Sequence, residues 1–327
     1  MTIREQLEQL EIKILAPQAC KSTDKGAVIR LKSETPCPYR TEFQRDRDRI
    51  LHCSAFRRLK HKTQVFLSPV GDHYRTRLTH TLEVSQVART IARALFLNED
   101  LTEAIALGHD MGHSPFGHAG ESVLNRICPH GYRHYEQSVR VADAIEHLNL
   151  TYAVRDGIIC HTNKTASTKE GNVVRLADRI AYINHDIEDA FRAGVLLPED
   201  LPADAVEVLG KTKSERITAL VSAVVSHGAD EIGMNPEMQK AFDILHDFMY
   251  ANVYLNENCK KEEKKAERLI ETLYQYFRKF PDKMPDSYQK IASESDIDRA
   301  VCDYISGMSD SFAVNLYSEL FIPEFWK

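Results

Sequence analysis

Apolar residues recur at helical spacing along most of this 327-residue chain, and no stretch alternates between apolar and polar residues as a strand would. The clearest example is 79–97, where Val84, Val87, Ile91 and Leu95 fall on one face of a helix. Further helices are expected over residues 1–14, 134–148, 173–191, 214–227, 235–255, 260–280 and 287–320, the last broken near Gly307. The pattern therefore predicts an all-α protein.

Breaks in this pattern suggest how the chain is organised. Residues 16–38 carry three prolines and little periodicity, and residues 162–172 are polar, so we expect an irregular arm and an exposed loop. We divide the chain into an N-terminal helix and mobile arm (1–38), a part that carries the candidate chemistry (39–200), and a C-terminal helical extension packed on the same domain (201–327).

Composition excludes several classes of protein. A hydrophobic content of 43% is ample for a core, and a net charge of −6 argues against a general nucleic-acid coat. The first ten residues resemble no signal peptide, and no apolar run approaches the length of a membrane span. Seven cysteines without a CxxC pair are typical of reduced thiols, so we expect a cytoplasmic protein.

One segment departs from the acidic balance. Between Arg40 and Lys62 there are eight arginines or lysines against three acids, a local charge of +5. These charges could belong to a solvated helix whose side chains pair along the surface. They could equally line an anion pocket, because arginine forks match phosphate oxygens. The charge alone does not decide between the two.

The densest candidate chemistry lies between Ala104 and Glu121. An apolar helical run ends there in the adjacent pair His109 and Asp110, and Glu121 closes a thirteen-residue stretch that also holds His113 and His118. A buried imidazole and carboxylate are unfavourable unless they are compensated, and a divalent metal is the simplest compensation. A polar helix cap is the alternative, but five ligand-type residues in one stretch favour the metal. We expect a new helix to begin at Ser114–Pro115.

Two other helices carry polar residues on a defined face. His80 lies in the apolar arc of 79–97, where a histidine is usually a core residue, but its position one helix before the His109–Asp110 pair favours a ligand role. On 173–191 one arc is polar and lacks lysine, which favours a cleft over a solvent face. Its members are Asp178, Tyr182, His185, Asp186 and Asp189.

In chain order, His80, His109–Asp110 and Asp178 form the H…HD…D pattern of the HD superfamily of metal-dependent phosphohydrolases. The flanking sequence is more specific. It resembles bacterial deoxyguanosinetriphosphate triphosphohydrolase-like proteins from about residue 28 to the C-terminus, in the motifs YRTEFQRDRDRILHCSAFRRLKHKTQVF, GHDMGHSPFGHAGE, HYEQS, ADRIAYINHDIEDA and DYISGMSD. Met111 replaces the usual leucine or isoleucine, a volume-conserving change.

This resemblance implies an HD-domain helical core and the hydrolysis of a deoxynucleoside triphosphate (dNTP) to deoxynucleoside and triphosphate. It further implies that a divalent ion (Mn, Mg, Fe, Co or Ni) is held by four ligands: His80, His109, Asp110 and Asp178. It implies three catalytic residues, His118, Glu121 (which orients His118) and His134 (near the phosphates). It implies five substrate-binding residues: Arg58, Gln64, Arg77, Tyr182 and Asp186.

The expected partners are the dNTP substrate, further copies of the chain in a homo-oligomer, and a dNTP or single-stranded DNA effector, with no membrane. Two alternatives stay open. One is another HD phosphohydrolase, such as a nucleotidase or a cyclic-nucleotide phosphodiesterase. The other is a non-catalytic regulator that binds nucleotide or nucleic acid. Loss of a metal ligand would favour the regulator, and none of the four is missing.

Overall fold

A computed structural model describes residues 1–64, 75–255 and 257–323 and confirms the all-α prediction. In these residues there is no strand, and one isolated antiparallel bridge joins Thr63 and Thr76. The α-helices are α1 (Ile3–Ile14), α2 (Glu42–His52), α3 (Ser54–Arg58), α4 (Arg77–Ala94), α5 (Glu99–Gly108), α6 (Gly117–Ile127), α7 (His134–Arg140), α8 (Tyr152–Cys160), α9 (Lys169–Arg192), α10 (Ala203–Leu209), α11 (Lys213–His227), α12 (Pro236–Met249), α13 (Glu257–Lys279), α14 (Asp286–Glu294), α15 (Ile297–Ser306) and α16 (Asp310–Phe321).

Local sequence explains where the central helices begin. Thr76 caps α4, Asn98 caps α5 and Thr168 caps α9, each accepting a hydrogen bond from a backbone N–H of the first turn. Such a cap satisfies donors that the helix itself leaves unpaired. The three helices that supply the candidate metal ligands therefore have well-defined starts.

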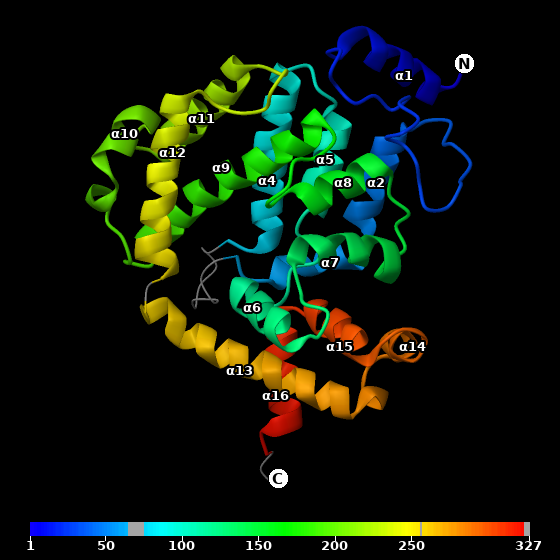
Figure 1. The fold of residues 1–327 in the computed structure, drawn as a ribbon, viewed down its shortest axis with the longest axis vertical. Coiled ribbons are helices and arrows are strands. Elements are labelled where there is room, and N and C mark those ends of the chain that lie inside the picture. The colour runs from blue at the N-terminus through cyan, green and yellow to red at the C-terminus, as the bar shows by residue number, and fades with distance from the viewer. Residues whose placement is uncertain (65–74, 256, 324–327) are drawn as a thin grey trace.

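The main core lies where α4, α5 and α9 pack together, with α2 and α8 against α5 (Figure 1). Ile180, Ile183 and Ile187 of α9 are fully buried, and so are the polar residues His185 and Asp186 on its other face. At these positions the polar face is not an ordinary solvent face, and the cleft expected along it stays a prediction. Burial of His185 and Asp186 implies that this part of the helix meets other polar groups.

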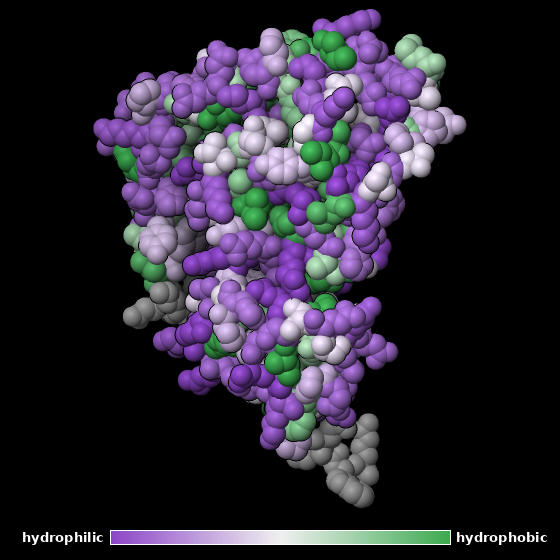
Figure 2. Space-filling model, turned by 45° about the vertical axis from the view of Figure 1, so that its right-hand side comes forward, coloured by the Kyte–Doolittle hydropathy of each residue, from purple (hydrophilic) through white to green (hydrophobic). Residues whose placement is uncertain are grey.

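A second apolar cluster joins α6 to the C-terminal helices α13, α15 and α16, in the lower part of Figure 1. Val123 and Leu124 of α6 pack in it with Ile270, Leu273 and Phe277 of α13. The face of the molecule drawn in Figure 2 is mainly hydrophilic, and its apolar residues form small separate groups. Among the described helices, none is both long and apolar enough to cross a membrane.

Three expectations about the elements are wrong. The helix expected at Ser114–Pro115 begins at Gly117, because Phe116 adopts a left-handed backbone (φ 61°) and Ser114 donates its hydroxyl to the Gly117 carbonyl. The expected loop 162–172 ends early, since Lys169 already begins α9. The expected helix 287–320 has the predicted break near Gly307, between α15 and α16, but it has a further break after Glu294 that was not expected. The proposed division at residues 38 and 200 stays a prediction.

The N-terminal arm is irregular, as expected, and is tied to the body of the protein. Arg30 donates to the carboxylates of Glu42 and Asp46 on α2. Asp46 is completely buried and also accepts from the Thr151 backbone N–H at 2.8 Å. A buried carboxylate needs such partners, so the arm and the start of α8 share one polar anchor.

The basic segment is largely paired with acids. Arg45 and Arg49 both donate to Glu34, and Arg47 donates to Asp100 at 2.9 Å. These contacts are long-range and structural, not the i,i+4 pairs expected of a solvated helix. The first half of the segment is therefore not an open anion pocket.

Candidate metal centre and active site

Four expected metal ligands converge from three elements. His80 lies on α4, His109 and Asp110 follow the last turn of α5, and Asp178 lies on α9. Asp178 Oδ1 is 3.1 Å from His80 Nε2 and 3.8 Å from His109 Nε2, and Asp110 Oδ2 is 3.5 Å from His109 Nε2. These two imidazoles and two carboxylates form one cluster, although His80 and Asp178 are nearly a hundred residues apart in the chain.

The cluster fits a divalent cation. His109 donates Nδ1–H to the Ala106 carbonyl at 2.6 Å, which leaves Nε2 with a lone pair, and this buried Nε2 has no hydrogen-bond partner among the described residues. A ring held in this way by a backbone carbonyl is the usual second contact of a metal-binding histidine. The ligand-type atoms of His80, His109 and Asp110 all lie within 4.8 Å of one another. A mixed nitrogen and oxygen set suits Mn, Fe, Co, Ni or Mg.

Both carboxylates of the cluster are held in the ionised form. Burial raises the pKa of Asp110, but His109 and the Arg77 guanidinium outweigh it and hold the pKa well below its usual range. Arg77 donates to Asp110 Oδ2 at 2.7 Å. Burial likewise opposes ionisation of Asp178, and the hydrogen bond with His80 still lowers the pKa of that carboxyl. The cluster is therefore negative enough to attract a cation.

Glu121 lies next to both expected catalytic histidines, His118 and His134. Its carboxylate accepts from His134 Nδ1 at 3.0 Å and from the His134 backbone N–H at 3.0 Å, and it lies 3.5 Å from His118 Nδ1. Burial raises the pKa of Glu121, but its hydrogen bonds with His118 and His134 lower that pKa below its usual range. His134 is buried, whereas the His118 side chain is 82% exposed. The resemblance assigned Glu121 to His118; in this structure its closer partner is His134.

His161 belongs to the site and was missed by the sequence reasoning. It donates Nδ1–H to the Ile158 carbonyl at 2.7 Å, and its Nε2 is 3.2 Å from His134 Nε2. Burial, His109 and His134 lower the pKa of His161 to about 4, so this ring is neutral. A signal existed: GIICHTN ends an apolar helix in a histidine just as AIALGHD does. His113, stacked on His134 with ring centroids 4.5 Å apart, completes this layer of imidazoles.

The expected substrate-binding residues are distributed around this layer. Tyr182 lies on α9 one turn after Asp178, and Asp186, a turn further, accepts a hydrogen bond from the Tyr254 hydroxyl. Burial raises the pKa of Asp186 to about 7. The buried Gln64 Oε1 has no hydrogen-bond partner among the described side chains and backbone groups.

The two expected phosphate arginines differ in their surroundings. Arg77 is buried and bonded to Asp110, with a weaker contact to the Gln64 carbonyl at 3.4 Å. Arg58 is about one-third exposed and lies 3.8 Å from Glu146. Arg77 is therefore part of the framework around the metal cluster, whereas Arg58 retains a solvent-facing guanidinium.

Two residues of the C-terminal helices, Ser306 and Asp310, contact segments beside the candidate site. The buried Lys62 donates to the carbonyls of His113 and Ser306, and burial and Arg58 lower the pKa of Lys62 to about 7. Asp310, the first residue of α16, accepts from the Thr63 N–H at 2.8 Å and from the Phe116 N–H at 2.9 Å. The segment before Gln64 and the start of α6, which carries His118, are thus held by the C-terminal helices.

Comparison with known proteins agrees with this geometry. The HD domain family matches residues 77–183, and the phosphohydrolase-associated domain family matches residues 232–319. A solved structure of a phosphohydrolase from Bacteroides thetaiotaomicron is 17% identical, covers 84% of this chain and 69% of its own, and has a TM-score of 0.52, so it supports the fold alone. The helical fold and the His/Asp cluster define an HD-domain phosphohydrolase, a metal-dependent class of hydrolase.

Similar proteins narrow this class of hydrolase to one family. A deoxyguanosinetriphosphate triphosphohydrolase-like protein of Caldanaerobacter subterraneus subsp. tengcongensis is 53% identical over 333 residues, which cover 100% of this chain and 98% of the relative. A protein of the same description from Desulfatibacillum aliphaticivorans is 47% identical, covering 99% of each chain. The chain belongs to the deoxyguanosinetriphosphate triphosphohydrolase-like family, and the family assigned from its motifs is confirmed.

Proposed function

We propose that this protein hydrolyses deoxynucleoside triphosphates to deoxynucleoside and triphosphate. The observation that carries the proposal is the buried pair of Glu121 and His134, set beside a His/Asp cluster with open ligand atoms. This arrangement provides a cation site and proton-transfer groups at one place. The descriptions of the relatives supply the choice of substrate.

Four residues would hold the metal: His80, His109, Asp110 and Asp178. When bound, a divalent cation polarises the α-phosphate and neutralises part of its charge. Arg77 keeps Asp110 ionised and fixed, and the Ala106 carbonyl keeps the lone pair of His109 directed into the cluster. These two contacts preorganise the ligands, so little conformational entropy is lost when the cation binds.

His118, His134 and Glu121 would handle protons and phosphate charge. Burial lowers the pKa of His134, but the hydrogen bond with Glu121 outweighs it and raises that pKa above its ordinary value. A protonated His134, with Nδ1 on Glu121 and Nε2 beside His161, places a positive charge near the phosphates. His118, at the exposed rim, gives a proton to the 5′-oxygen as its bond to the α-phosphorus breaks. Water supplies the hydroxyl that the α-phosphorus gains, and the proton that this water loses returns His118 to its protonated form.

The remaining residues would bind the nucleotide. Tyr182 packs under the deoxyribose and leaves no room for a 2′-hydroxyl, with Asp186 beside the sugar and Gln64 at the 3′-hydroxyl. Arg58 and Arg77 attract the phosphates. The Tyr254 hydroxyl fixes Asp186 by a hydrogen bond and makes this side of the site rigid.

The test is incubation with each of the four dNTPs and Mn²⁺ or Mg²⁺, followed by chromatography. Deoxynucleoside and triphosphate are the expected products, with a loss of activity in an Asp178→Asn variant. Release of orthophosphate or a monophosphate instead would indicate the other HD phosphohydrolase activities. Tight nucleotide binding without turnover would indicate the regulator.

A further inference from the structure

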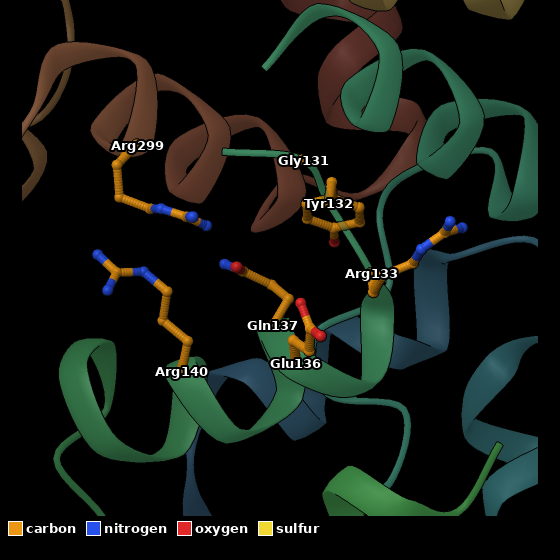
Figure 3. Close-up of a pocket in the computed structure, with 7 residues that line it drawn as sticks. All are labelled: Gly131, Tyr132, Arg133, Glu136, Gln137, Arg140 and Arg299. Atoms are coloured by element: carbon orange, nitrogen blue, oxygen red, sulfur yellow. The ribbon is translucent and has the colours of Figure 1, made fainter. Parts of the chain in front are cut away.

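A cavity of about 230 Å³ lies beside α7, the helix that begins at His134 (Figure 3). It is bounded on one side by α7 and the residues before it, and on the other by α15. Seven residues line it: Gly131, Tyr132, Arg133, Glu136, Gln137, Arg140 and Arg299. Three arginines against one glutamate in such a space are exceptional in a chain of net charge −6.

One of these arginines is fixed by a buried carboxylate. Arg140 Nε and Nη2 donate to the two oxygens of Asp303 at 2.8 and 2.6 Å, and Asp303 is completely buried. Gln137 Nε2 donates to the same carboxylate at 2.9 Å. A fork held by two hydrogen bonds has lost its rotational freedom already, so binding a further anion costs little ordering entropy.

The second arginine faces the first. Arg299 extends from α15 into the cavity toward Arg140, and the Gln137 amide points into the same space (Figure 3). In the described parts of the chain no carboxylate pairs with the Arg299 guanidinium. Asp303 compensates the charge of Arg140, whereas the Arg299 guanidinium has no such carboxylate among the described residues, so an anion in the cavity would compensate Arg299. The volume greatly exceeds the roughly 30 Å³ share of a single water, so a phosphate group fits.

We propose that this cavity is an anion site for a phosphate group, and that its occupancy raises turnover by fixing α7. Arginine forks select phosphate over halide because they match paired oxygens. The phosphate group can come from free phosphate or from a nucleotide, and the two sources are distinguished below. The proposed phosphate binding does not depend on the proposed function, whereas the effect on turnover rests on it.

The physical connection to the active site runs through α7. His134 is its first residue, and Gln137 and Arg140 belong to the same short helix. Ser138, between them, accepts from the Gly112 N–H at 2.9 Å and donates to the His109 carbonyl at 2.6 Å. A phosphate that holds α7 to α15 therefore restrains both His134 and the turn that carries a candidate metal ligand.

Arg299→Gln tests the binding, because Arg299 has no structural ion pair to lose. Arg268→Gln, at an exposed position on α13, is the matched control. Calorimetric titration of the metal-loaded protein with orthophosphate should show a site that is weakened at least about tenfold in Arg299→Gln, partly restored in Arg299→Lys, and unchanged in the control. Binding of orthophosphate and of a dNTP that are both equal in wild type and Arg299→Gln overturns the proposal.

A measurement on the wild type covers the case in which the variant does not fold. Phenylglyoxal modifies accessible guanidinium groups, and mass spectrometry locates the modified peptides. Saturating orthophosphate should protect Arg299 and leave Arg268 reactive. Modification of Arg299 that neither saturating orthophosphate nor a saturating dNTP reduces overturns the proposal.

Two further arms identify the source of the phosphate and the effect on rate. If a dNTP binds at a second stoichiometric site that depends on Arg299, and orthophosphate does not bind there, the site is assigned to a nucleotide. If orthophosphate binds there, the site is assigned to free phosphate. Turnover of wild type, but not of Arg299→Gln, should rise severalfold when the site is filled. A turnover rate that is the same with the anion site empty and filled refutes the proposed effect on turnover. A wild type that hydrolyses no dNTP refutes the proposed function and leaves the binding result standing.

Discussion

Replacement of Asp310 by alanine should impair the active site from a distance. Its two carboxylate oxygens accept from the backbone N–H groups of Thr63 and Phe116, at 2.8 and 2.9 Å. Phe116 adopts the left-handed conformation that a residue with a Cβ rarely takes, and it immediately precedes α6. Without the carboxylate, this strained start of α6 and the loop before Gln64 both lose their support.

The magnitude follows from the contacts removed. A hydrogen bond to a charged group contributes roughly 1.5–3 kcal/mol, so two of them contribute at most about 3–6 kcal/mol. Relief of the left-handed strain at Phe116 returns about 1–2 kcal/mol. The unfolding free energy of Asp310→Ala should therefore fall by about 2–4 kcal/mol. Asp310→Asn, which keeps one acceptor, should lose about half as much.

Turnover should fall more than the metal content. The start of α6 positions His118 and Glu121, and a displacement of about 1 Å at such groups is able to cost on the order of 10²-fold in rate. The metal cluster makes no contact with Asp310, so bound metal should stay constant. Urea unfolding, kcat with a dNTP and metal analysis measure the three quantities. Asp282→Ala, at an exposed aspartate of the same C-terminal region, is the control. Equal stability and kcat in the two variants would refute the reasoning.

Four other substitutions address separate features. Asp178→Ala should abolish turnover and remove the metal while far-UV circular dichroism stays unchanged; full metal content would exclude Asp178 as a ligand. His118→Ala should lower kcat by about 10²–10⁴-fold with little change in nucleotide affinity, and the double variant with Glu121→Gln should be far from additive; an unchanged kcat would remove His118 from the chemistry. Tyr182→Ala should relax discrimination against ribonucleotides, a prediction that fails if wild type already hydrolyses GTP as fast as dGTP. Burial raises the pKa of Glu170 to about 7, above the unfolded value of 4.5, so this residue should lower wild-type stability by up to about 3 kcal/mol as pH rises from 4.5 to 7. Glu170→Gln should reduce the slope of stability against pH in denaturant titrations, leaving the part due to Asp186, and an identical slope would contradict this.

Much of the fold follows from local sequence. Helical periodicity and caps are short-range properties, so the bounds of α4 and α9 were predicted within a few residues. The start of α6 was not. Ser114–Pro115 has the composition of a helix start, but the buried turn places Phe116 in a left-handed conformation and shifts the start to Gly117. Tertiary packing overrode the local preference.

The sequence by itself also determined the family and the identity of the candidate ligands, because an ordered set of motifs such as His109–Asp110 is read without coordinates. Only the tertiary structure decided which groups meet. It brought His161 to within 3.2 Å of His134, paired Arg47 with Asp100, and set Asp310 beneath the start of α6. Such contacts join residues far apart in the chain. Their partners are chosen by the packing of whole helices, which leaves no periodic trace in the sequence.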